Sequence, residues 1–317
     1  MNVLLTGGCG FIGSNLIPAF LDNESVTKLI VLDNLSTGKL KNITPFLKNR
    51  KIEFIEGDIC DLALCQKLSR GIDLISHQAA LGSVPRSIQD PIMTNNVNIN
   101  GFLNILVSAK DNGVKRFVFA ASSSTYGDSK NLPKTEDIIG NPLSPYAVTK
   151  YVNELYASVF CKVYGMPYIG LRYFNVFGPN QDPHSSYSAV IPLFCKSILE
   201  GKELNINGDG SISRDFTYVE NVVKANMQSL FTKNTGAINN VYNIACGKSS
   251  TLKYLAEFLI HLSGKKISIK FGAERLGDIA HSLADISKAA RLLNYSPEIN
   301  FEVGLQRTWQ YYSNTID

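Results

Sequence analysis

The sequence predicts an α/β protein, built as a doubly wound parallel sheet with a smaller C-terminal α/β lobe. Short apolar runs alternate with helical patterns through the first 170 residues, and a glycine-rich turn follows the first of these runs. After Asn175 the alternation loosens into loops, short strands and helices. Strands that alternate with helices are typical of parallel sheets with helices on both faces, which bind ligands at the carboxyl ends of their strands.

The strands expected in the sheet are six short runs of mainly apolar residues. They span residues 3–6, 29–33, 52–55, 74–76, 116–121 and 168–173. Helices are expected where apolar residues recur at three- and four-residue spacing. In the first part of the chain these segments are 12–21, 97–109 and 146–163, and in the second part 189–199, 252–262 and 286–293.

Composition excludes several classes of protein. The chain has 317 residues, of which 44% are hydrophobic and 18% charged, as in ordinary folded proteins. Its net charge is only +4, and its 31 basic residues are scattered, so we expect no nucleic-acid partner. No apolar run approaches the roughly 20 residues of a membrane span, so we expect no membrane partner.

The N-terminus and the cysteines indicate a cytoplasmic protein. The chain enters a buried strand within its first few residues, so we expect no signal peptide. Its cysteines form no C-x-x-C pair and lack the spacing of metal ligands. They lie at positions 9, 60, 65, 161, 195 and 246. We therefore expect reduced thiols and no metal site.

The glycine-rich turn predicts a dinucleotide site. Gly7, Gly10 and Gly13 follow the first strand and open the first helix, whose N-terminus offers free N–H groups to phosphates. Asp33 ends the second strand, 20 residues after Gly13, where a carboxylate binds the adenosine ribose. The next four residues include no Arg that could accept a 2′-phosphate, so the sequence favours NAD over NADP.

The Rossmann-like sheet is therefore expected to be the NAD-binding domain. We assign it residues 1–175, with a return of the chain at about 217–244. Residues 176–317 are expected to form the substrate-binding lobe, which closes over the sheet. Further cofactor contacts are expected where the third and fourth strands end, at Asp58 and in the run 77–80.

A Tyr and a Lys four residues apart form the candidate catalytic pair. Tyr146 and Lys150 share one face of a helix that Ser144 caps. A nearby ammonium, together with a positive nicotinamide ring, favours the phenolate and should lower the pKa of Tyr146. Tyr146 is then a plausible base for a sugar hydroxyl. Tyr126 and Lys130 have the same spacing, but the residues between them indicate a loop, so we take that match as chance.

Hydroxyl side chains end the fifth strand close to this pair. Ser122, Ser123 and Ser124 run off that strand and lie where they could bond to a reacting oxygen. A polar turn after a strand would explain one such serine more easily than three. We expect this cluster to lie beside Tyr146.

These motifs resemble the extended short-chain dehydrogenase/reductase family, and within it the nucleotide-sugar 4-epimerases. The resemblance covers nearly the whole chain, including LRYFNVFGP at 171–179, RDF at 214–216 and RLGD at 275–278. Two strings are most similar to the branch that interconverts UDP-N-acetylglucosamine and UDP-N-acetylgalactosamine. They are HQAALGSVPRS at 77–87 and NPLSPYAVTK at 141–150.

The resemblance implies a catalytic mechanism and a set of cofactor contacts. Tyr146 would remove the C4 hydroxyl proton as hydride passes to NAD, with Lys150 as its partner and Ser122 or Ser123 as the third group. The hydride would then return to the other face of a 4-keto sugar, so NAD should copurify. The implied cofactor contacts beyond the glycines, Asp33, Tyr146 and Lys150 are Phe11, Ile12, Asn34, Ser36, Thr37, Gly38, Asp58, Ile59, Gln78, Ala79, Ala80, Asn98 and Tyr173.

The resemblance also implies substrate contacts. Arg214 and Arg275 would bind the diphosphate, because a guanidinium matches phosphate oxygens, and Asp278 would approach the uridine ribose. Ser282, four residues after Asp278, would line the sugar pocket, where a small residue admits a 2-N-acetyl group and a Tyr goes with plain hexoses. The other implied substrate contacts are Ser83, Ser122, Ser123, Tyr146, Asn175, Ala189, Val190, Asn205 and Asn207.

Several alternatives stay open. Related 4,6-dehydratases carry an Asp-Glu pair where this chain has Ser123 and Ser124, which argues against dehydration. The substrate could instead be UDP-glucose or galactose, or a UDP-uronate whose carboxylate meets Arg86 or another cation. A non-catalytic NAD sensor is a remote alternative. By analogy with the family we expect a homodimer and a role in polysaccharide biosynthesis.

Overall fold

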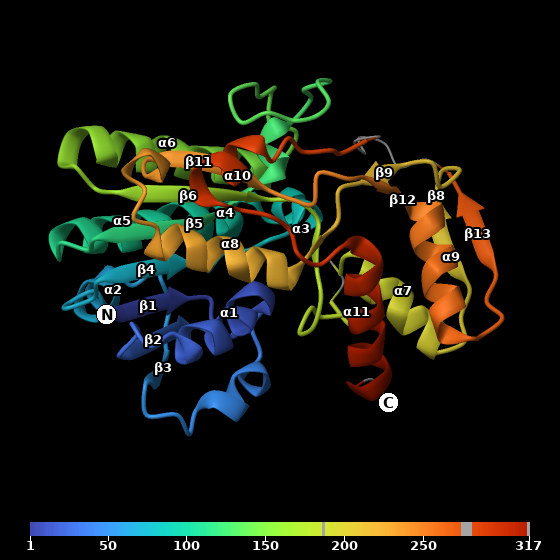
Figure 1. Cartoon of the computed structure of the whole chain (residues 1–317), viewed down its shortest axis with the longest axis horizontal. Helices are drawn as coiled ribbons and strands as arrows, with labels where there is room; N and C mark the ends of the chain where they lie inside the picture. The colour runs from blue at the N-terminus through green and yellow to red at the C-terminus, as the bar shows by residue number, and fades with distance from the viewer. Residues whose placement is uncertain (186–187, 274–280, 316–317) are drawn as a thin grey trace.

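The large sheet has seven parallel strands and lies beside a smaller lobe (Figure 1). The computed structural model describes residues 1–185, 188–273 and 281–315. Strand order is β11-β6-β5-β4-β1-β2-β3, and all neighbours are parallel. The strands are β1 (Asn2–Thr6), β2 (Lys28–Asp33), β3 (Ile52–Glu56), β4 (Leu74–His77), β5 (Arg116–Ser122), β6 (Tyr168–Tyr173) and β11 (Asn240–Ile244).

This arrangement confirms the predicted Rossmann-like fold. The six expected strands are all present, and each observed bound lies within one residue of the expected one. The direction of winding reverses between β1 and β4, and that reversal creates a crevice at the carboxyl ends of the two strands. The seventh strand, β11, pairs with β6 and extends the sheet at that edge.

Helices cover both faces of the sheet. One face packs against α1 (Phe11–Asp22) and α8 (Val219–Phe231), and the other against α2 (Leu62–Leu68), α5 (Phe102–Asp111) and α6 (Pro145–Tyr164). Val3 and Leu5 of β1 join the first core and Leu4 joins the second. Successive side chains of a strand point to opposite faces, so a strand buried on both faces is apolar throughout.

The helix α6, which carries Tyr146 and Lys150, has clear start and stop signals. The Ser144 hydroxyl accepts a hydrogen bond from the Ala147 N–H at 3.1 Å, and Pro145 occupies the first turn. Gly165 follows the last turn with φ +68°, a left-handed conformation that suits glycine. These signals lie in the sequence itself, which is why the expected helix 146–163 differs by only one residue at each end.

The helix expected at 97–109 differs from expectation at its start. Residues Asn96–Gly101 form a π-helical turn, η3, and the α-helix α5 begins only at Phe102. Within η3, Asn98 accepts from the Leu81 N–H at 2.8 Å and donates to Thr149 Oγ1 at 3.1 Å. The π turn therefore connects the loop after β4 to α6, and such turns are frequent at functional sites.

Short helices and a two-stranded pair complete the larger part of the molecule, which is built around the sheet. Two short helices precede η3 and pack against α6, and a two-stranded pair leads toward the lobe. These elements are α3 (Val84–Gln89), α4 (Pro91–Asn95), η1 (Leu40–Asn42), η2 (Thr44–Phe46), η4 (Ser123–Tyr126), η5 (Thr235–Ala237), β7 (Val176–Phe177) and β10 (Thr217–Tyr218).

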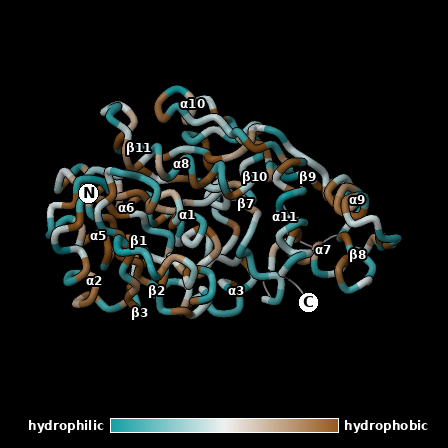
Figure 2. The backbone as a smooth tube through the Cα atoms, turned by 60° about the horizontal axis from the view of Figure 1, so that its bottom comes forward, coloured by the Kyte–Doolittle hydropathy of each residue, from teal (hydrophilic) through white to brown (hydrophobic). Residues whose placement is uncertain are grey.

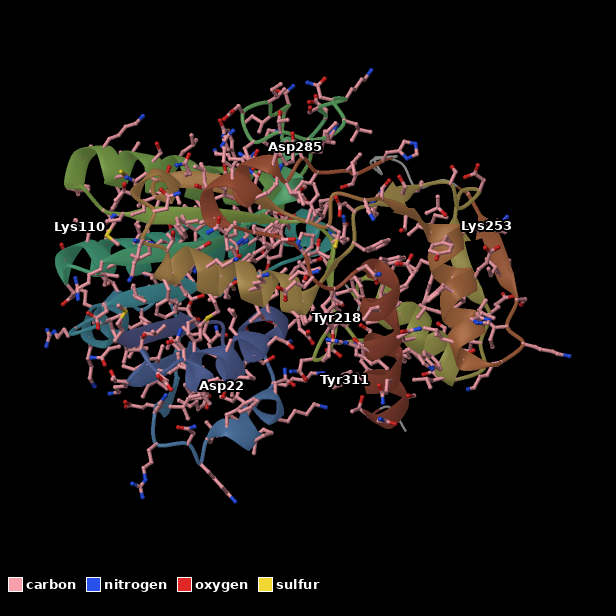
Figure 3. All side chains as sticks on the ribbon, in the orientation of Figure 1. Asp22, Lys110, Tyr218, Lys253, Asp285 and Tyr311 are labelled. Atoms are coloured by element: carbon pink, nitrogen blue, oxygen red, sulfur yellow. The ribbon has the colours of Figure 1, made fainter. Side chains whose placement is uncertain are left out.

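The smaller lobe has its own apolar core. Figure 2 shows hydrophobic stretches both around α5 and α6 and in α9 of the lobe. Tyr311 belongs to α11 (Phe301–Thr315), and Tyr218 lies close to this helix, where the two parts of the molecule meet (Figure 3). The remaining elements are α7 (Val190–Leu199), β8 (Leu204–Asn207), β9 (Ser213–Arg214), β12 (Ser250–Thr251), α9 (Leu252–Ser263), β13 (Ile269–Gly272), α10 (Ser287–Leu293) and α11 (Phe301–Thr315). Of these, α10 returns to the sheet and packs against β11.

Candidate active site

The glycine-rich turn between β1 and α1 has no room for side chains at two positions. A Cβ on Gly7, whose φ is +70°, would lie 2.6 Å from the Ala79 nitrogen. A Cβ on Gly13 would lie 2.1 Å from the Gly7 carbonyl oxygen. The bare backbone brings β1, the loop after β4 and the start of α1 together, as a dinucleotide pyrophosphate requires.

Asp33 ends β2 and also holds the turn in place. One carboxylate oxygen accepts from the Cys9 N–H at 2.9 Å and the other from the Leu35 N–H at 2.8 Å. Burial raises the pKa of Asp33, while these backbone donors and that of Gly10 oppose the rise. Asp33 lines the cavity as well, so the residue that supports the turn also faces the cavity.

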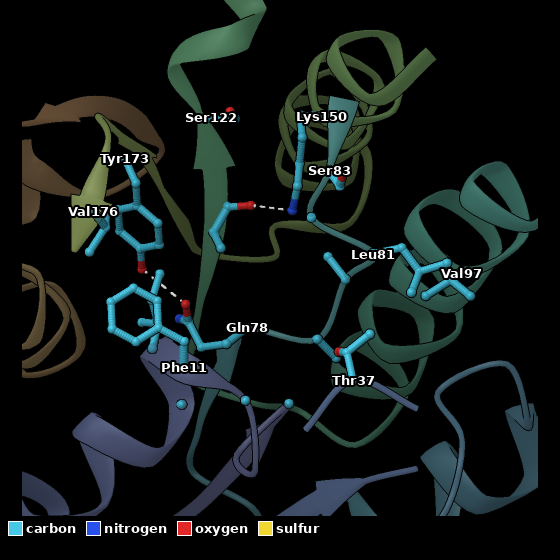
Figure 4. A pocket seen from close by; sticks show the side chains of 18 of the residues that line it. Phe11, Thr37, Gln78, Leu81, Ser83, Val97, Ser122, Lys150, Tyr173 and Val176 are labelled. Carbon is cyan, nitrogen blue, oxygen red and sulfur yellow. Dashed lines mark hydrogen bonds between the residues drawn. The ribbon is translucent and has the colours of Figure 1, made fainter. Parts of the chain in front are cut away.

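A cavity of about 590 Å³ opens at the carboxyl ends of the sheet strands (Figure 4). Ser122 and Lys150 lie at one end of it, and Thr37 lies at the other. Most of the expected cofactor contacts line its wall: Gly7, Gly10, Phe11, Ile12, Gly13, Asp33, Asn34, Ser36, Thr37, Ile59, Gln78, Ala79, Ala80, Tyr146, Lys150 and Tyr173. Ser83, Ser122, Ser123, Asn175 and Ala189, expected to contact the substrate, line it too.

Three expected cofactor residues lie behind this wall. Gly38 packs against Cys9, where an added Cβ would meet the Cys9 side chain at 2.9 Å. Asp58 accepts from the Cys60 N–H and from the Asn34 amide, both at 2.8 Å. Asn98 binds Leu81 and Thr149 from η3. The Asp58 and Asn98 side chains bond to the lining residues Asn34 and Leu81, and Gly38 packs against the glycine-rich turn.

The structure brings Tyr146 and Lys150 together in the cavity wall. The Lys150 ammonium lies 5.9 Å from the centre of the Tyr146 ring and donates to the Ala120 carbonyl oxygen at 2.8 Å. Lys150 is only 3% exposed, and burial lowers its pKa to about 8, with the Glu154 charge opposing. The bond to Ala120 anchors the ammonium to β5, next to the serines that end this strand.

Burial changes the expected ionisation of Tyr146. The sequence predicted a lowered pKa, but burial raises the pKa of Tyr146, and the Ser122 hydroxyl opposes the rise. In the protein alone, the cost of moving a phenolate out of water exceeds the effect of the Ser122 hydrogen bond. The predicted lowering therefore depends on the nicotinamide charge that the bound cofactor would add.

The three serines after β5 have different environments. Ser122 Oγ accepts from the Ser124 N–H at 3.2 Å and from the Ser124 hydroxyl at 2.8 Å. Ser122 and Ser123 line the large cavity, whereas Ser124 lines only a second one. Ser122 is thus the serine that both faces Tyr146 and is oriented by a neighbour.

The other Tyr and Lys with the same spacing are not a catalytic pair. Tyr126 is 1% exposed, and its hydroxyl donates to Asn243 Oδ1 at 2.5 Å. Lys130 lies beyond the end of η4, in the loop. The expected loop between the two residues is confirmed, and their side chains share no helix.

A hydrogen-bond chain missed by the sequence analysis borders the cavity. The Tyr173 hydroxyl donates to Gln78 Oε1 at 3.1 Å and accepts from the Asn226 amide at 2.8 Å (Figure 4). Asn226 comes from α8, far along the chain, and no local motif marks it. Gln181, Leu81 and Val97 also line the cavity without having been expected.

Two smaller cavities extend from the large one. One, of about 390 Å³, is lined by Ser123, Lys134, Arg214, Ser282 and other residues, and one of about 220 Å³ by Ala189, Val190 and Arg214 among others. Asn175 lines all three cavities and therefore lies at their junction. Asn175, Arg214 and Ser282, which are distant in the sequence, thus line adjoining cavities where the lobe meets the large cavity.

Two expected substrate residues lie away from these cavities, and two more fall in a part of the chain that the structure does not describe. Asn205 and Asn207 lie on β8 with exposed side chains, outside the linings of the three cavities. Their position in the strand, which alternates buried and exposed residues, turns them away from the lobe's core. Arg275 and Asp278 lie outside the described residues.

Comparison with known proteins identifies the family. A model of the NAD dependent epimerase/dehydratase family matches residues 3–245. This chain belongs to that family. Its cofactor is NAD, and the glycine turn and Asp33 fit that cofactor on their own geometry.

Relatives and solved structures of this family cover the whole fold. A putative UDP-glucose 4-epimerase from Methanocaldococcus jannaschii is 36% identical over 98% of each chain. The structure of UDP-N-acetylglucosamine 4-epimerase from Methanobrevibacter ruminantium M1, in complex with UDP-N-acetylmuramic acid, is 40% identical, with a TM-score of 0.93 and 99% of each chain covered. That of a Bacillus cereus UDP-glucuronic acid 4-epimerase, with UDP-glucuronic acid and NAD, is 34% identical, with a TM-score of 0.91 and 99% of each chain covered.

The described residues show neither a metal-binding cluster nor a membrane helix. Within them no three His, Cys, Asp or Glu side chains gather as a cation would require. No helix in the same part of the chain has both the length and the hydrophobicity needed to span a bilayer. All six cysteines are free thiols.

Proposed function

We propose that this protein is an NAD-dependent 4-epimerase of UDP-sugars, and that it interconverts UDP-N-acetylglucosamine and UDP-N-acetylgalactosamine. The observation that carries the proposal is the position of Tyr146, Lys150 and Ser122. They lie in the wall of the dinucleotide cavity, next to its junction with the cavity that Ser282 lines. The 4-epimerases among the relatives support the same reaction class.

The protein's own residues manage the proton at C4. Tyr146 accepts the proton of the C4 hydroxyl and returns it after the ring has turned over. The Lys150 ammonium, held by the Ala120 carbonyl, stabilises the phenolate, and Ser122 bonds to the reacting oxygen. NAD, when bound, supplies the hydride acceptor that makes this exchange of configuration possible. Gln78, Ala79 and Tyr173 line the cavity where the reacting end of the cofactor is expected.

The substrate contacts divide between the two smaller cavities. Arg214 lines both of them and is the described cation best placed for a diphosphate. Ser282 leaves room in the second cavity for a 2-N-acetyl group, which a larger side chain would fill. The similarity to a UDP-N-acetylglucosamine 4-epimerase at 40% identity supports this choice of sugar.

A second candidate substrate is a UDP-uronate. Lys134 lines the second cavity and is 5% exposed, and burial lowers the pKa of its ammonium. Among the described residues it makes no ion pair, and its ammonium donates to the Ser129 carbonyl oxygen. A buried cation favours an anionic ligand, so Lys134 is better placed for a sugar carboxylate than Arg86, which lies on α3 outside the three cavity linings.

We also propose a homodimer formed through α6 and its neighbours. Leu155, Val159 and Val163 lie on one side of α6, and each is about half exposed or more. Ile92 of α4, which packs against α6, is 82% exposed. A patch of this kind on a folded chain favours association, and a second copy presents the same apolar helices.

The function is tested with purified protein, no added NAD, and three substrates in separate reactions. We expect UDP-N-acetylglucosamine to give UDP-N-acetylgalactosamine, followed by the anomeric proton signals in NMR spectra. UDP-glucose and UDP-glucuronate test the specificity. Conversion of UDP-glucuronate alone would favour a UDP-uronate as the substrate. If a protein that holds NAD converts none of the UDP-sugars, the epimerase proposal is overturned in favour of a sensor.

A matched pair of variants links turnover to the catalytic tyrosine. Tyr146→Phe should abolish conversion while keeping bound NAD. Tyr164→Phe changes an exposed tyrosine at the end of the same helix and should convert at the wild-type rate. Equal loss in both variants would assign the effect to α6 as a whole rather than to the Tyr146 hydroxyl.

A further inference from the structure

Asp215 is a buried carboxylate that binds backbone groups from two distant segments. Its Oδ1 accepts from the Cys246 N–H at 2.9 Å, and its Oδ2 accepts from the N–H groups of Gly247 and Ala284 at 3.1 and 3.2 Å. Asp215 is fully buried, and burial raises its pKa to about 6 against these bonds. A buried charge requires such partners, and here they come from the end of the large sheet and from the chain before α10.

Ser213 binds the same segment two residues earlier. Its hydroxyl pairs with His281 Nδ1 at 2.9 Å, and its carbonyl oxygen accepts from the Ser282 N–H at 3.1 Å. Alternate residues of an extended chain point to the same side, so Ser213 and Asp215 share one side and Arg214 points to the other. We name residues 281–285 the specificity arm. It is joined to Ser213 and Asp215 by three hydrogen bonds.

The specificity arm forms one wall of the second cavity. His281 and Ser282 line that cavity together with Arg214. Asp215 also reaches the opposite side of the site, because its backbone oxygen accepts from the Asn175 amide at 3.1 Å. Asn175 lies at the junction of the three cavities. Ser213 and Asp215 flank Arg214 in the chain. They therefore connect Arg214 to Ser282 and Asn175, and all three of these residues are expected to contact the substrate.

We propose that Ser213 and Asp215 are positioning residues that hold the specificity arm and Asn175 around the sugar, and so set the affinity for the nucleotide sugar. This inference rests on the proposed function. Neither side chain lines any of the three cavities, so each acts through the residues it holds. The glycine turn, Tyr146 and Lys150 lie on other elements, so NAD retention and the chemical step should be affected far less than substrate affinity.

Asp215→Asn is the most informative variant. It keeps the volume of the side chain but replaces one acceptor oxygen by an amide NH2, which cannot accept from the buried N–H groups. We expect KM for UDP-N-acetylglucosamine to rise about tenfold, because a buried N–H left without an acceptor has a cost of that order. We expect kcat to change less than about threefold, since the reacting groups stay in place.

Asp209→Asn is the matched control. Asp209 is an exposed carboxylate in the same lobe, and it accepts from the Ser211 N–H at 2.8 Å. The same chemical change at this position should leave KM, kcat and NAD content at wild-type values. The NAD content of each purified variant, measured by absorbance after denaturation, reports whether the sheet domain has folded.

Ser213→Ala provides a milder test in case Asp215→Asn does not fold. It removes the hydroxyl that holds His281 but keeps the backbone bond to Ser282, so we expect KM to rise two- to fivefold. Wild-type KM in both Ser213→Ala and a folded Asp215→Asn would overturn the proposal. A fall in kcat at unchanged KM in Asp215→Asn would also overturn it, because that pattern places the effect on the chemical step.

Direct binding separates this inference from the proposed function. The dissociation constant of UDP, measured by calorimetry, does not depend on turnover. We expect weaker UDP binding in Asp215→Asn than in Asp209→Asn, because Arg214 lies next to the altered carboxylate. If the wild type binds UDP but converts no UDP-sugar, the epimerase proposal fails. The comparison of UDP affinities between Asp215→Asn and Asp209→Asn still decides whether Asp215 supports the site.

Discussion

At the scale of single residues, burial sets the protonation of the catalytic pair. It raises the pKa of Tyr146 and lowers the pKa of Lys150 to about 8, so both side chains are pushed toward their neutral forms. The bond from Lys150 to the Ala120 carbonyl and the charge of Glu154 counteract this for the ammonium. The phenolate form of Tyr146 then depends on the positive charges of Lys150 and of the nicotinamide ring when NAD is bound.

Lys150→Met tests the contribution of the ammonium. We expect kcat to fall by roughly 100-fold, because the phenolate loses its nearest cation while Tyr146 itself remains. The measurement is kcat for UDP-N-acetylglucosamine between pH 6 and 9, where the variant should also need a higher pH for its best rate. Lys162→Met, in the exposed last turn of α6, is the control and should behave as wild type.

His77 gives a prediction about stability and pH. It is buried between Phe102 and Phe117, its Nδ1 lies 2.8 Å from Thr6 Oγ1, and burial lowers its pKa from 6.5 to about 3. The unfolded chain therefore binds more protons between about pH 3 and 6.5, so stability is lost as the pH falls through this window. Relative to pH 8, the loss from this group at pH 5 is roughly 2 kcal/mol.

Thermal unfolding of the wild type and of His77→Phe checks this prediction. The wild-type midpoint should fall more steeply than that of the variant between pH 7.5 and 5. The comparison uses slopes, because the substitution also removes the bond to Thr6 and so changes the absolute midpoint. Parallel slopes would show that His77 is not the group that titrates.

At the scale of elements, the sequence predicted what local signals determine. The strands β1 to β6 and the helices α1 and α6 follow from apolar periodicity, the glycine turn and the cap at Ser144, all of which are local. The π turn η3 was not foreseen, because Asn98 bonds to Leu81 and Thr149, which are distant in the sequence. Periodicity alone cannot distinguish a π turn from the α-helix that follows it.

The cap of α6 can be tested against a second cap in the lobe. Ser144→Ala removes the acceptor of the Ala147 N–H, and Thr251→Ala removes the corresponding acceptor of α9. We expect each variant to lose about 1 kcal/mol of unfolding free energy. Only Ser144→Ala should also lower kcat, because α6 carries Tyr146 and Lys150. Denaturant unfolding and turnover measured on the same samples distinguish the two, and an equal loss of kcat would contradict this role of the cap.

At the scale of the whole molecule, the site forms where the lobe meets the sheet. The residues expected at the cofactor line one cavity, since the glycine turn, Asp33 and Gln78 all lie at or just after the carboxyl ends of strands that end at one edge. The sequence placed the substrate side less well. Asn205 and Asn207 are exposed, while Lys134 and Gln181 line cavities without having been expected. Contacts between parts distant in the sequence decide these positions, and no local pattern reports them.

The proposed dimer makes a prediction at the same scale. Val159→Asp places a charge in the middle of the apolar side of α6, where two copies would meet. We expect the wild type to elute as a dimer in size-exclusion chromatography with light scattering, and the variant to shift toward the monomer. Lys48→Asp, on an exposed side chain between η2 and β3, is the control. A monomeric wild type at micromolar concentrations would contradict the proposed interface.

The most direct test of the central claim follows the hydrogen at C4. Wild-type protein with no added NAD is incubated with UDP-N-acetylglucosamine in D2O, and the product is examined by NMR and mass spectrometry. We predict UDP-N-acetylgalactosamine that carries the original hydrogen at C4 and no deuterium, because a hydride retained in the site does not exchange with water, whereas the proton on Tyr146 does. Deuterium at C4 would contradict the account, since it would mean that the carbon was deprotonated rather than oxidised.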